Sequence, residues 1–264
     1  GSQGRGVGAM TAGLTFVAVT ILVVMRAASL SRVPEALARM DTFRVSEVRL
    51  EGNRFLTRDE ALKTLDLPAS ASVWDDLDPW EDQLKQHLLV ESVRIRRRLP
   101  GALVLEVRES APVALVPTPA LEPVDGEGRF LPIDPAKHRL DLPVMALEGG
   151  GALEKPSASE RRLLAREISR ISQGHPQLLS RISELTLHPR GDLRARIWRR
   201  DPAGEVWDLP FNLLFRPDLP VRRVQEGLRV LEDARERFGG AEILDLDLRY
   251  EDQVVVRLNR AEES

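Results

Sequence analysis

Few of the side chains that usually carry chemistry occur in spacings that would support it. None of the four histidines, His87, His138, His175 and His188, forms an H-x-x-x-H or H-E-x-x-H pair of the kind that binds zinc. The chain has no cysteine, which excludes thiolate nucleophiles, disulfides and cysteine-based zinc sites. The sequence therefore predicts no metal site and no cofactor.

Two carboxylates are the best candidates for acid–base chemistry. Asp245 and Asp247 alternate along a predicted strand and so share one of its faces. Such a pair could act as a general acid and a general base, but it is more often solvated or paired with arginines. The G-x-S-x-G motif of a serine nucleophile is absent from the sequence. We therefore expect no catalytic residue, no small-molecule substrate and no enzyme.

A basic cluster, Arg94, Arg96, Arg97 and Arg98, lies on another predicted strand. The net charge of −3 argues against nucleic-acid binding, which needs a strong basic excess. Two interpretations remain open for this cluster. It is either a solvated strand face or a docking patch for an acidic partner or for lipid head groups.

The N-terminal segment predicts a membrane anchor. Residues 6–25 contain no charged residue and are bounded by Arg5 and Arg26. A helix of this length spans about 30 Å, the thickness of the hydrocarbon core of a bilayer. A cleaved signal peptide is the alternative, but the run is long and Ala27-Ala28-Ser29 makes a poor cleavage site.

The segment that follows alternates between strand and helix patterns. Val48 and Leu50 alternate with charged residues before a Gly52-Asn53 turn, and Thr57 with Glu60 forms a capping box. A second helix is predicted from Asp78-Pro79, with an apolar stripe that runs on to Leu88. The predicted order is strand, helix, helix, strand, strand. The strands are expected at residues 45–50, 93–96 and 103–107, and the helices are expected to begin at residues 57 and 78.

The remaining residues predict a mixed α/β unit. Ser157 with Glu160 caps a helix that Gly174 and Pro176 end, and a longer helix is expected over residues 218–238. Period-two apolar patterns around these helices predict strands. They include Leu185 and Leu187, Leu193 to Ile197, Val206, residues 244–250 and the closing run Val254 to Leu258.

These patterns together resemble the FtsQ/DivIB family of cell-division proteins. The first unit carries Phe43-x-Val45-x-x-Val48, Gly52-Asn53, Val93-x-Ile95-x-Arg97-x-x-Pro100-x-x-Leu103 and Glu109-x-x-Pro112-Val113-Ala114. The end carries Asp247-Leu248-Arg249-Tyr250 followed by Val254-x-Val256-Arg257, similar to the family's terminal D-L-R-Y element. Leu209-Pro210-Phe211 departs from the glycine that the family often has there.

The resemblance implies an α+β protein with an N-terminal transmembrane helix, a POTRA domain of order βααββ and a mixed α/β "β-domain". We expect an extended, antiparallel-rich sheet and two helices in the β-domain. The expected organisation is a residual cytoplasmic tail at 1–5, a membrane helix at 6–28, a linker at 29–42, the POTRA domain at 43–112, the β-domain at 113–260 and a tail at 261–264.

The resemblance also implies a function through binding. The family is a single-pass inner-membrane scaffold, with its bulk outside the cytoplasm at the division septum, and it binds FtsB- and FtsL-type proteins. Its last strand holds the partner, and other divisome proteins could bind through the POTRA domain. Carried over, the partner-binding residues are Arg249, Tyr250, Val254, Val255, Val256 and Arg257.

Within that set, Tyr250 is expected to be an aromatic anchor, with Val254 and Val256 as strand contacts. Alternatively, both valines face the core and only the backbone pairs with the partner. Two other classes of protein stay open: a POTRA-bearing component of an outer-membrane assembly or translocation system, and an anchored enzyme with an unrecognised site.

Overall fold

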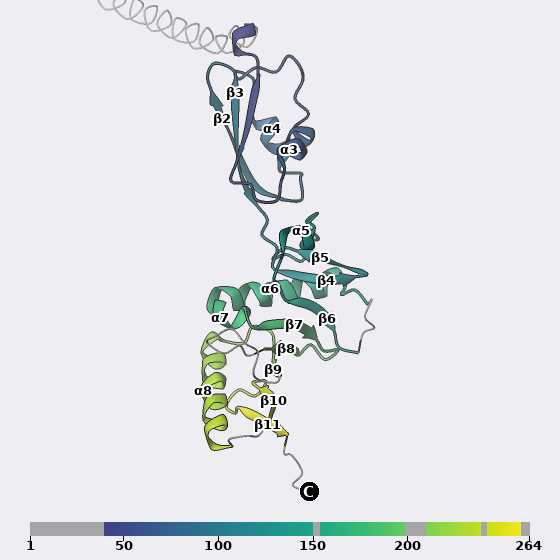
Figure 1. Cartoon of the computed structure of the whole chain (residues 1–264), viewed down its shortest axis with the longest axis vertical. Coiled ribbons are helices and arrows are strands. Elements are labelled where there is room, and N and C mark those ends of the chain that lie inside the picture. The colour runs from purple at the N-terminus through teal and green to yellow at the C-terminus, as the bar shows by residue number, and fades with distance from the viewer. Residues whose placement is uncertain (1–39, 150–153, 199–209, 239–241, 260–264) are drawn as a thin grey trace, which may run out of the picture. The chain divides into compact units, whose positions relative to one another are not determined.

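The computed structural model describes residues 40–149, 154–198, 210–238 and 242–259, and the chain divides into two compact units between Glu109 and Ser110 (Figure 1). The predicted membrane helix, the two predicted tails and Val206 lie outside these residues. Within the described ranges, every helix is too short or too polar to cross a bilayer.

The first unit has the predicted order of strands and helices. After a short 3-10 turn, η1 (Asp41–Phe43), β1 and β2 flank β3, with β1 parallel and β2 antiparallel to it. The predicted βααββ arrangement is therefore confirmed. The elements are β1 (Glu47–Glu51), α3 (Arg58–Leu65), α4 (Asp78–Leu84), β2 (Val90–Arg98) and β3 (Ala102–Glu109).

Local chemistry explains where α3 begins. The Thr57 side chain accepts a hydrogen bond from the Glu60 amide, and the Glu60 carboxylate accepts one from the Thr57 amide, so both halves of the predicted capping box form. The helix buries Ala61 and Leu65. They join a core whose fully buried members include Leu56, Leu84, Leu103 and Leu105.

Helix α4 is shorter than its apolar stripe predicted. It ends at Leu84, so Leu88 lies beyond the helix and is 60% exposed. The Glu81 side chain of α4 instead accepts a hydrogen bond of 2.7 Å from the backbone amide of Ile95 in β2. Because β2 is an edge strand of the first sheet, this contact satisfies one backbone amide, that of Ile95, for which no neighbouring strand of the described structure supplies a partner.

The second unit is an eight-stranded mixed sheet in the order β11-β10-β9-β8-β7-β6-β4-β5. Four of its seven strand pairings are antiparallel and three are parallel. The strands are β4 (Ala114–Thr118), β5 (Ala120–Val124), β6 (Val144–Leu147), β7 (Ile182–Leu187), β8 (Leu193–Ile197), β9 (Phe211–Phe215), β10 (Glu242–Asp247) and β11 (Val255–Asn259).

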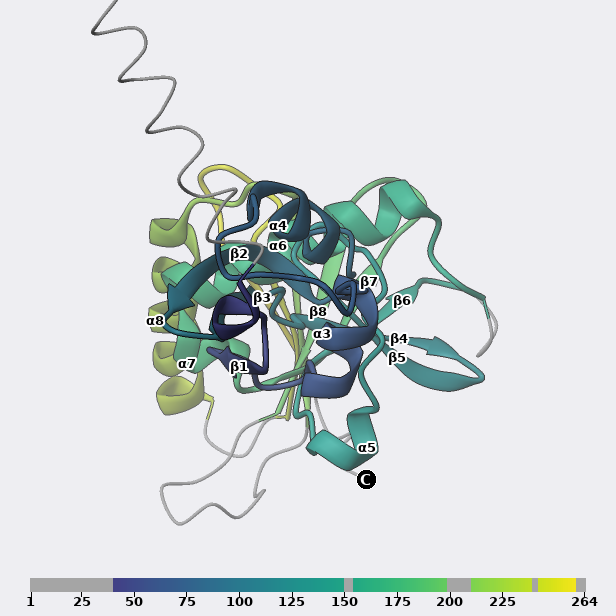
Figure 2. The ribbon, with the colours of Figure 1, turned by 90° about the horizontal axis from the view of Figure 1, so that it is seen from above.

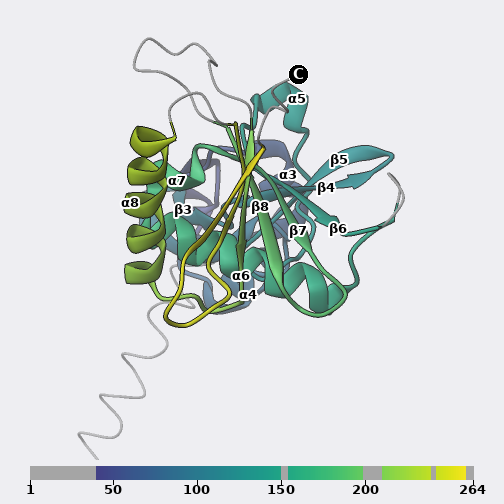
Figure 3. The same cartoon turned by 90° about the horizontal axis from the view of Figure 1, so that it is seen from below.

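Two long helices and two short ones accompany this sheet: α5 (Pro135–His138), α6 (Ala158–Gly174), α7 (Pro176–Leu179) and α8 (Val221–Arg237). The last of these is shorter than the predicted range of 218–238. Buried residues of α6, α7 and α8 share one apolar cluster with the strands, including Leu164, Leu178 and Leu231. Figures 2 and 3 show α7 beside α8, while the β4–β5 hairpin projects at the opposite end of the sheet.

The two ends of the second sheet differ. At one end, β5 contains Pro123, which has no amide proton, and the Pro123 carbonyl already accepts a hydrogen bond from the Leu131 amide. At the other end, β11 pairs with β10 on one side, and no described strand lies on its other side. Within the described sheet, β11 is thus an edge strand whose outer row of backbone groups has no partner strand.

Candidate functional site

The residues of the predicted partner-binding strand divide between the two faces of the sheet. Val254, Val256 and Leu258 pack against the hydrophobic core. Val255 and Arg257 are more exposed and line the opposite face. Val254 and Val256, which were expected to contact the partner, therefore face the core, as in the alternative interpretation in which only the backbone pairs with the partner. Their part in partner binding stays a prediction.

Tyr250 lies in the connection between β10 and β11 and is 50% exposed. A half-exposed aromatic side chain can add apolar area to a contact with another chain. Its predicted role as an anchor is compatible with this position.

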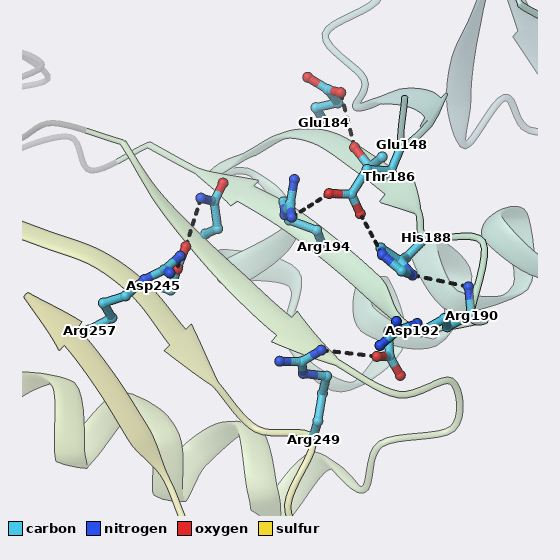
Figure 4. A network of polar contacts seen from close by, with 11 residues as sticks. Glu148, Glu184, Thr186, His188, Arg190, Asp192, Arg194, Asp245, Arg249 and Arg257 are labelled. Atoms are coloured by element: carbon cyan, nitrogen blue, oxygen red, sulfur yellow. Dashed lines mark hydrogen bonds and ion pairs between the residues drawn. The ribbon is translucent and has the colours of Figure 1, made fainter. Parts of the chain in front are cut away.

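Arg249 is held by two carboxylates at the start of the same connection. Its guanidinium donates to both carboxylate oxygens of Asp247, over 2.9 and 2.6 Å, and to Asp192, over 3.0 Å. Figure 4 shows Asp192 approaching from the turn between β7 and β8. The arginine thus ties the β10–β11 connection to a segment 57 residues away in sequence.

Burial alone would raise the pKa of Asp247, but hydrogen bonds from the Arg249 side chain and backbone, and the charge of Arg249, outweigh it. The pKa of Asp247 is lowered as a result. The pKa of Arg249 is raised, mainly by its hydrogen bond to Asp247. Both groups are therefore ionised throughout the physiological range.

A charged groove of about 310 Å³ continues from this pair across the open face of the sheet. Asp245 pairs with Arg257 of β11 and accepts a hydrogen bond from Asn212. Glu148 pairs with Arg194 and, at 3.7 Å, with His188 (Figure 4). The two strand aspartates are thus paired with arginines, and among the described residues no cluster of histidine and carboxylate groups is arranged to hold a metal ion.

The β10–β11 connection is also held by helix α8. Arg223 donates to the carbonyl oxygens of Tyr250 and Gln253, over 2.8 and 2.7 Å, and pairs with Glu226. Sequence reasoning identified neither Arg223 nor Asp192. No spacing rule links either residue to the terminal motif, because both contacts join elements that are distant in sequence.

The four arginines of the first unit differ in the contacts that they make, and their role as a docking patch stays a prediction. Arg96 pairs with Glu106 across the sheet, whereas the Arg97 side chain donates to the carbonyl oxygens of Val73 and Asp75. Arg98 lies near Glu47, whose pKa is lowered first by a hydrogen bond from Arg49 and to a smaller extent by the charge of Arg98. Arg94 is exposed, and within the described chain it has no ion-pair partner.

Comparisons with known proteins fit both units. Residues 43–110 match the family model of the FtsQ-type POTRA domain. Cell division protein FtsQ of Anaeromyxobacter sp. is 30% identical over 234 residues, which cover 83% of this chain and 73% of that protein.

Two further FtsQ proteins match shorter segments. FtsQ of Myxococcus fulvus is 30% identical over 148 residues, and FtsQ of Syntrophotalea carbinolica is 29% identical over 140 residues. These matches cover 53% and 50% of this chain, and 52% and 50% of the relatives, so they span about half the length of those relatives. The extent of the Anaeromyxobacter match and the POTRA match together show that this chain belongs to the FtsQ/DivIB family of cell division proteins.

Proposed function

We propose that this chain is a bitopic divisome scaffold that binds other membrane-anchored division proteins, of the FtsB and FtsL type, through its extracytoplasmic domains. Family membership supports a role in division, and the edge strand β11 supports binding by strand addition. The three relatives are all FtsQ proteins, which favours this function over a component of outer-membrane assembly.

The observation that carries the proposal is the unpaired outer edge of β11. A partner segment in extended conformation can add there as a ninth strand, and its backbone hydrogen bonds supply affinity. The opposite end of the sheet is less suited to strand addition, because Pro123 lacks an amide proton and its carbonyl accepts a hydrogen bond from Leu131. Among the described strands of the second unit, β11 is therefore the favoured place for strand addition.

Side chains on each face of β11 would give the contact its specificity. On the open face, Val255 and Arg257 would lie beside alternate side chains of the added strand. Arg249 and Arg257 are already paired with aspartates, so we expect electrostatic attraction to contribute less than backbone pairing. Tyr250 supplies an exposed aromatic surface in the connection that leads to β11.

An anchor before residue 40 would strengthen this binding. A scaffold and a partner that both lie in the inner membrane meet at a raised effective concentration, so a modest affinity between their extracytoplasmic parts is enough. In our proposal the resulting complex links assembly at the septum to peptidoglycan synthesis and catalyses no reaction itself.

The test is a titration of residues 41–264 with a peptide from the C-terminal region of the FtsB-type protein of the same cell. We expect micromolar or tighter binding, which Tyr250→Ala weakens and truncation after Arg249 abolishes. Methylation of peptide amides at alternate positions provides a sharper test, because it removes donors without changing the protein.

Methylation of the amides that face β11 is expected to abolish binding. Methylation of the other set, which points away, is the matched control and is expected to have little effect. Equal effects of the two sets, or full binding after truncation, would place the contact elsewhere in the chain.

In the POTRA domain, we propose that the docking patch is reduced to Arg94 and Arg98, because Arg96 and Arg97 already contact the domain itself. Arg94→Glu combined with Arg98→Glu should therefore leave binding of the FtsB-type peptide unchanged. The same variant should weaken any other acidic division partner that is captured by the full-length chain.

A further inference from the structure

The connection between β10 and β11 is fixed from both faces of the sheet before any partner is present. On the helix face, the guanidinium of Arg223 bridges the carbonyl oxygens of Tyr250 and Gln253, and this side chain is only 13% exposed. On the open face, Asp192 and Asp247 hold Arg249. The contacts lie at both ends of the segment that carries Tyr250.

The packing beneath this connection is also tight. Leu248 is buried, and its amide donates to the carbonyl of Leu214 over 2.8 Å. A Cβ atom at Gly227 of α8 would lie 2.6 Å from a methyl carbon of Leu248, so the helix approaches the strand closely there. This close approach places Arg223, one helical turn earlier, within reach of the loop carbonyls.

We propose that Arg223 and Asp192 are positioning residues for the partner-binding edge: they preorganise the β10–β11 connection without touching the partner. This inference rests on the proposed function of β11. A loose connection would have to be ordered when the partner strand adds, and that loss of conformational freedom would weaken binding. Contacts that order the connection in the free protein remove this penalty.

The geometry favours arginine at position 223. Its planar guanidinium reaches two carbonyl oxygens and the Glu226 carboxylate at once, whereas a lysine ammonium is a single point charge. Arg223→Lys should therefore preserve only part of the effect. Asp192 acts on the other face through one ion pair to Arg249.

Arg222 provides a matched control on the same helix. It also pairs with Glu226, over 3.0 Å, but its side chain is 84% exposed and no contact with the connection is seen in the described structure. Arg222→Gln thus removes a neighbouring charge and an ion pair of the helix without releasing the loop.

The experiment compares the wild type, Arg223→Gln, Asp192→Asn and Arg222→Gln as residues 41–264. Amide hydrogen exchange is measured over residues 249–257, with and without the FtsB-type peptide, and peptide binding kinetics are measured in parallel. In Arg223→Gln, exchange in the free protein should be faster, while the complex should be protected as in the wild type. Its affinity should fall by about tenfold, mostly through a faster off-rate.

Asp192→Asn should show the same pattern to a smaller extent, and Arg222→Gln should match the wild type in exchange and affinity. Unchanged exchange in Arg223→Gln would overturn the inference. Faster exchange with unchanged affinity would also overturn it, and would leave the proposed function standing. Absence of peptide binding by the wild type would overturn the proposed function and this inference together.

Discussion

Single side chains in this protein fix loops by reaching across from another strand. The Glu109 carboxylate accepts hydrogen bonds from the amides of Phe55 and Leu56, 54 and 53 residues earlier in the chain. Just before that loop, Gly52 has φ +81°, and a Cβ atom there would clash with the carbonyl oxygen of Val107. The family motif residues Gly52 and Glu109 therefore hold the same loop in place.

This geometry predicts the effect of adding one methyl group. Gly52→Ala should destabilise the POTRA domain by about 3 kcal/mol, because it adds a steric clash to a strained backbone. Gly191→Ala is the control: its φ is +88° but the space around it is open, so only the conformational penalty of about 1–2 kcal/mol applies. Urea unfolding of both variants measures these values, and equal losses would contradict the prediction.

At the scale of elements, helix starts depend on local chemistry. The Ser157 side chain accepts a hydrogen bond from the Glu160 amide, and the Glu160 carboxylate accepts one from the Ser157 amide over 2.7 Å. The pKa of Glu160 is lowered by its side-chain and backbone hydrogen bonds with Ser157. The helix that begins here, α6, supplies four apolar residues to the core, so its first turn affects the whole unit.

The lowered pKa gives this capping box a defined pH dependence. A carboxyl group whose folded pKa is depressed adds stability above its unfolded pKa of about 4.3, and the contribution is lost as pH falls through the folded value. Glu160→Ala should therefore destabilise the unit at pH 7, with a difference from the wild type that shrinks below pH 4. Ser157→Ala, which should cost about 1 kcal/mol, is the variant for comparison.

Urea unfolding at several pH values measures both effects. A Glu160→Ala difference that is constant from pH 7 to pH 3 would argue that the carboxylate contributes nothing to the start of α6.

The sequence predicted the elements whose ends are set by residues that are close together in the chain. Capping boxes at Thr57 and Ser157 lie within four residues of chain, so their helix starts were found. The end of α4 was missed, because the hydrogen bond of Glu81 with Ile95 depends on how the helix packs against β2. Asp192 and Arg223 were missing from the predicted site for the same reason. Arg223 is 27 residues from Tyr250 and Asp192 is 57 residues from Arg249, and no local sequence pattern predicts contacts over such separations.

At the scale of the molecule, the two units have separate hydrophobic cores. The large apolar cluster of the second unit contains buried residues from Ala114 to Leu248 only. The first unit has its own fully buried residues, such as Leu103 and Leu105. The two compact units divide between Glu109 and Ser110, and the expected boundary between residues 112 and 113 stays a prediction.

Separate cores predict separate unfolding transitions. Leu103→Ala should destabilise the POTRA domain by about 2–5 kcal/mol and lower only one transition. Leu185→Ala, which empties a fully buried position in the other core, should lower only the second transition. Differential scanning calorimetry of residues 41–264 separates the two events. A joint shift of both transitions after either change would show that the units unfold as one.

The asymmetry of the eight-stranded sheet limits what it can build. If both ends could accept a strand, each molecule could join two neighbours, and growth would continue as a fibre. Among the described strands, the β5 end offers a partner less, because Pro123 has no amide proton and its carbonyl already accepts from Leu131. If a partner strand adds at β11 as proposed, we expect each sheet to accept one. On the proposed mode of binding, one proline and one backbone hydrogen bond at the end of the sheet opposite β11 would thus set how many partners a molecule can take.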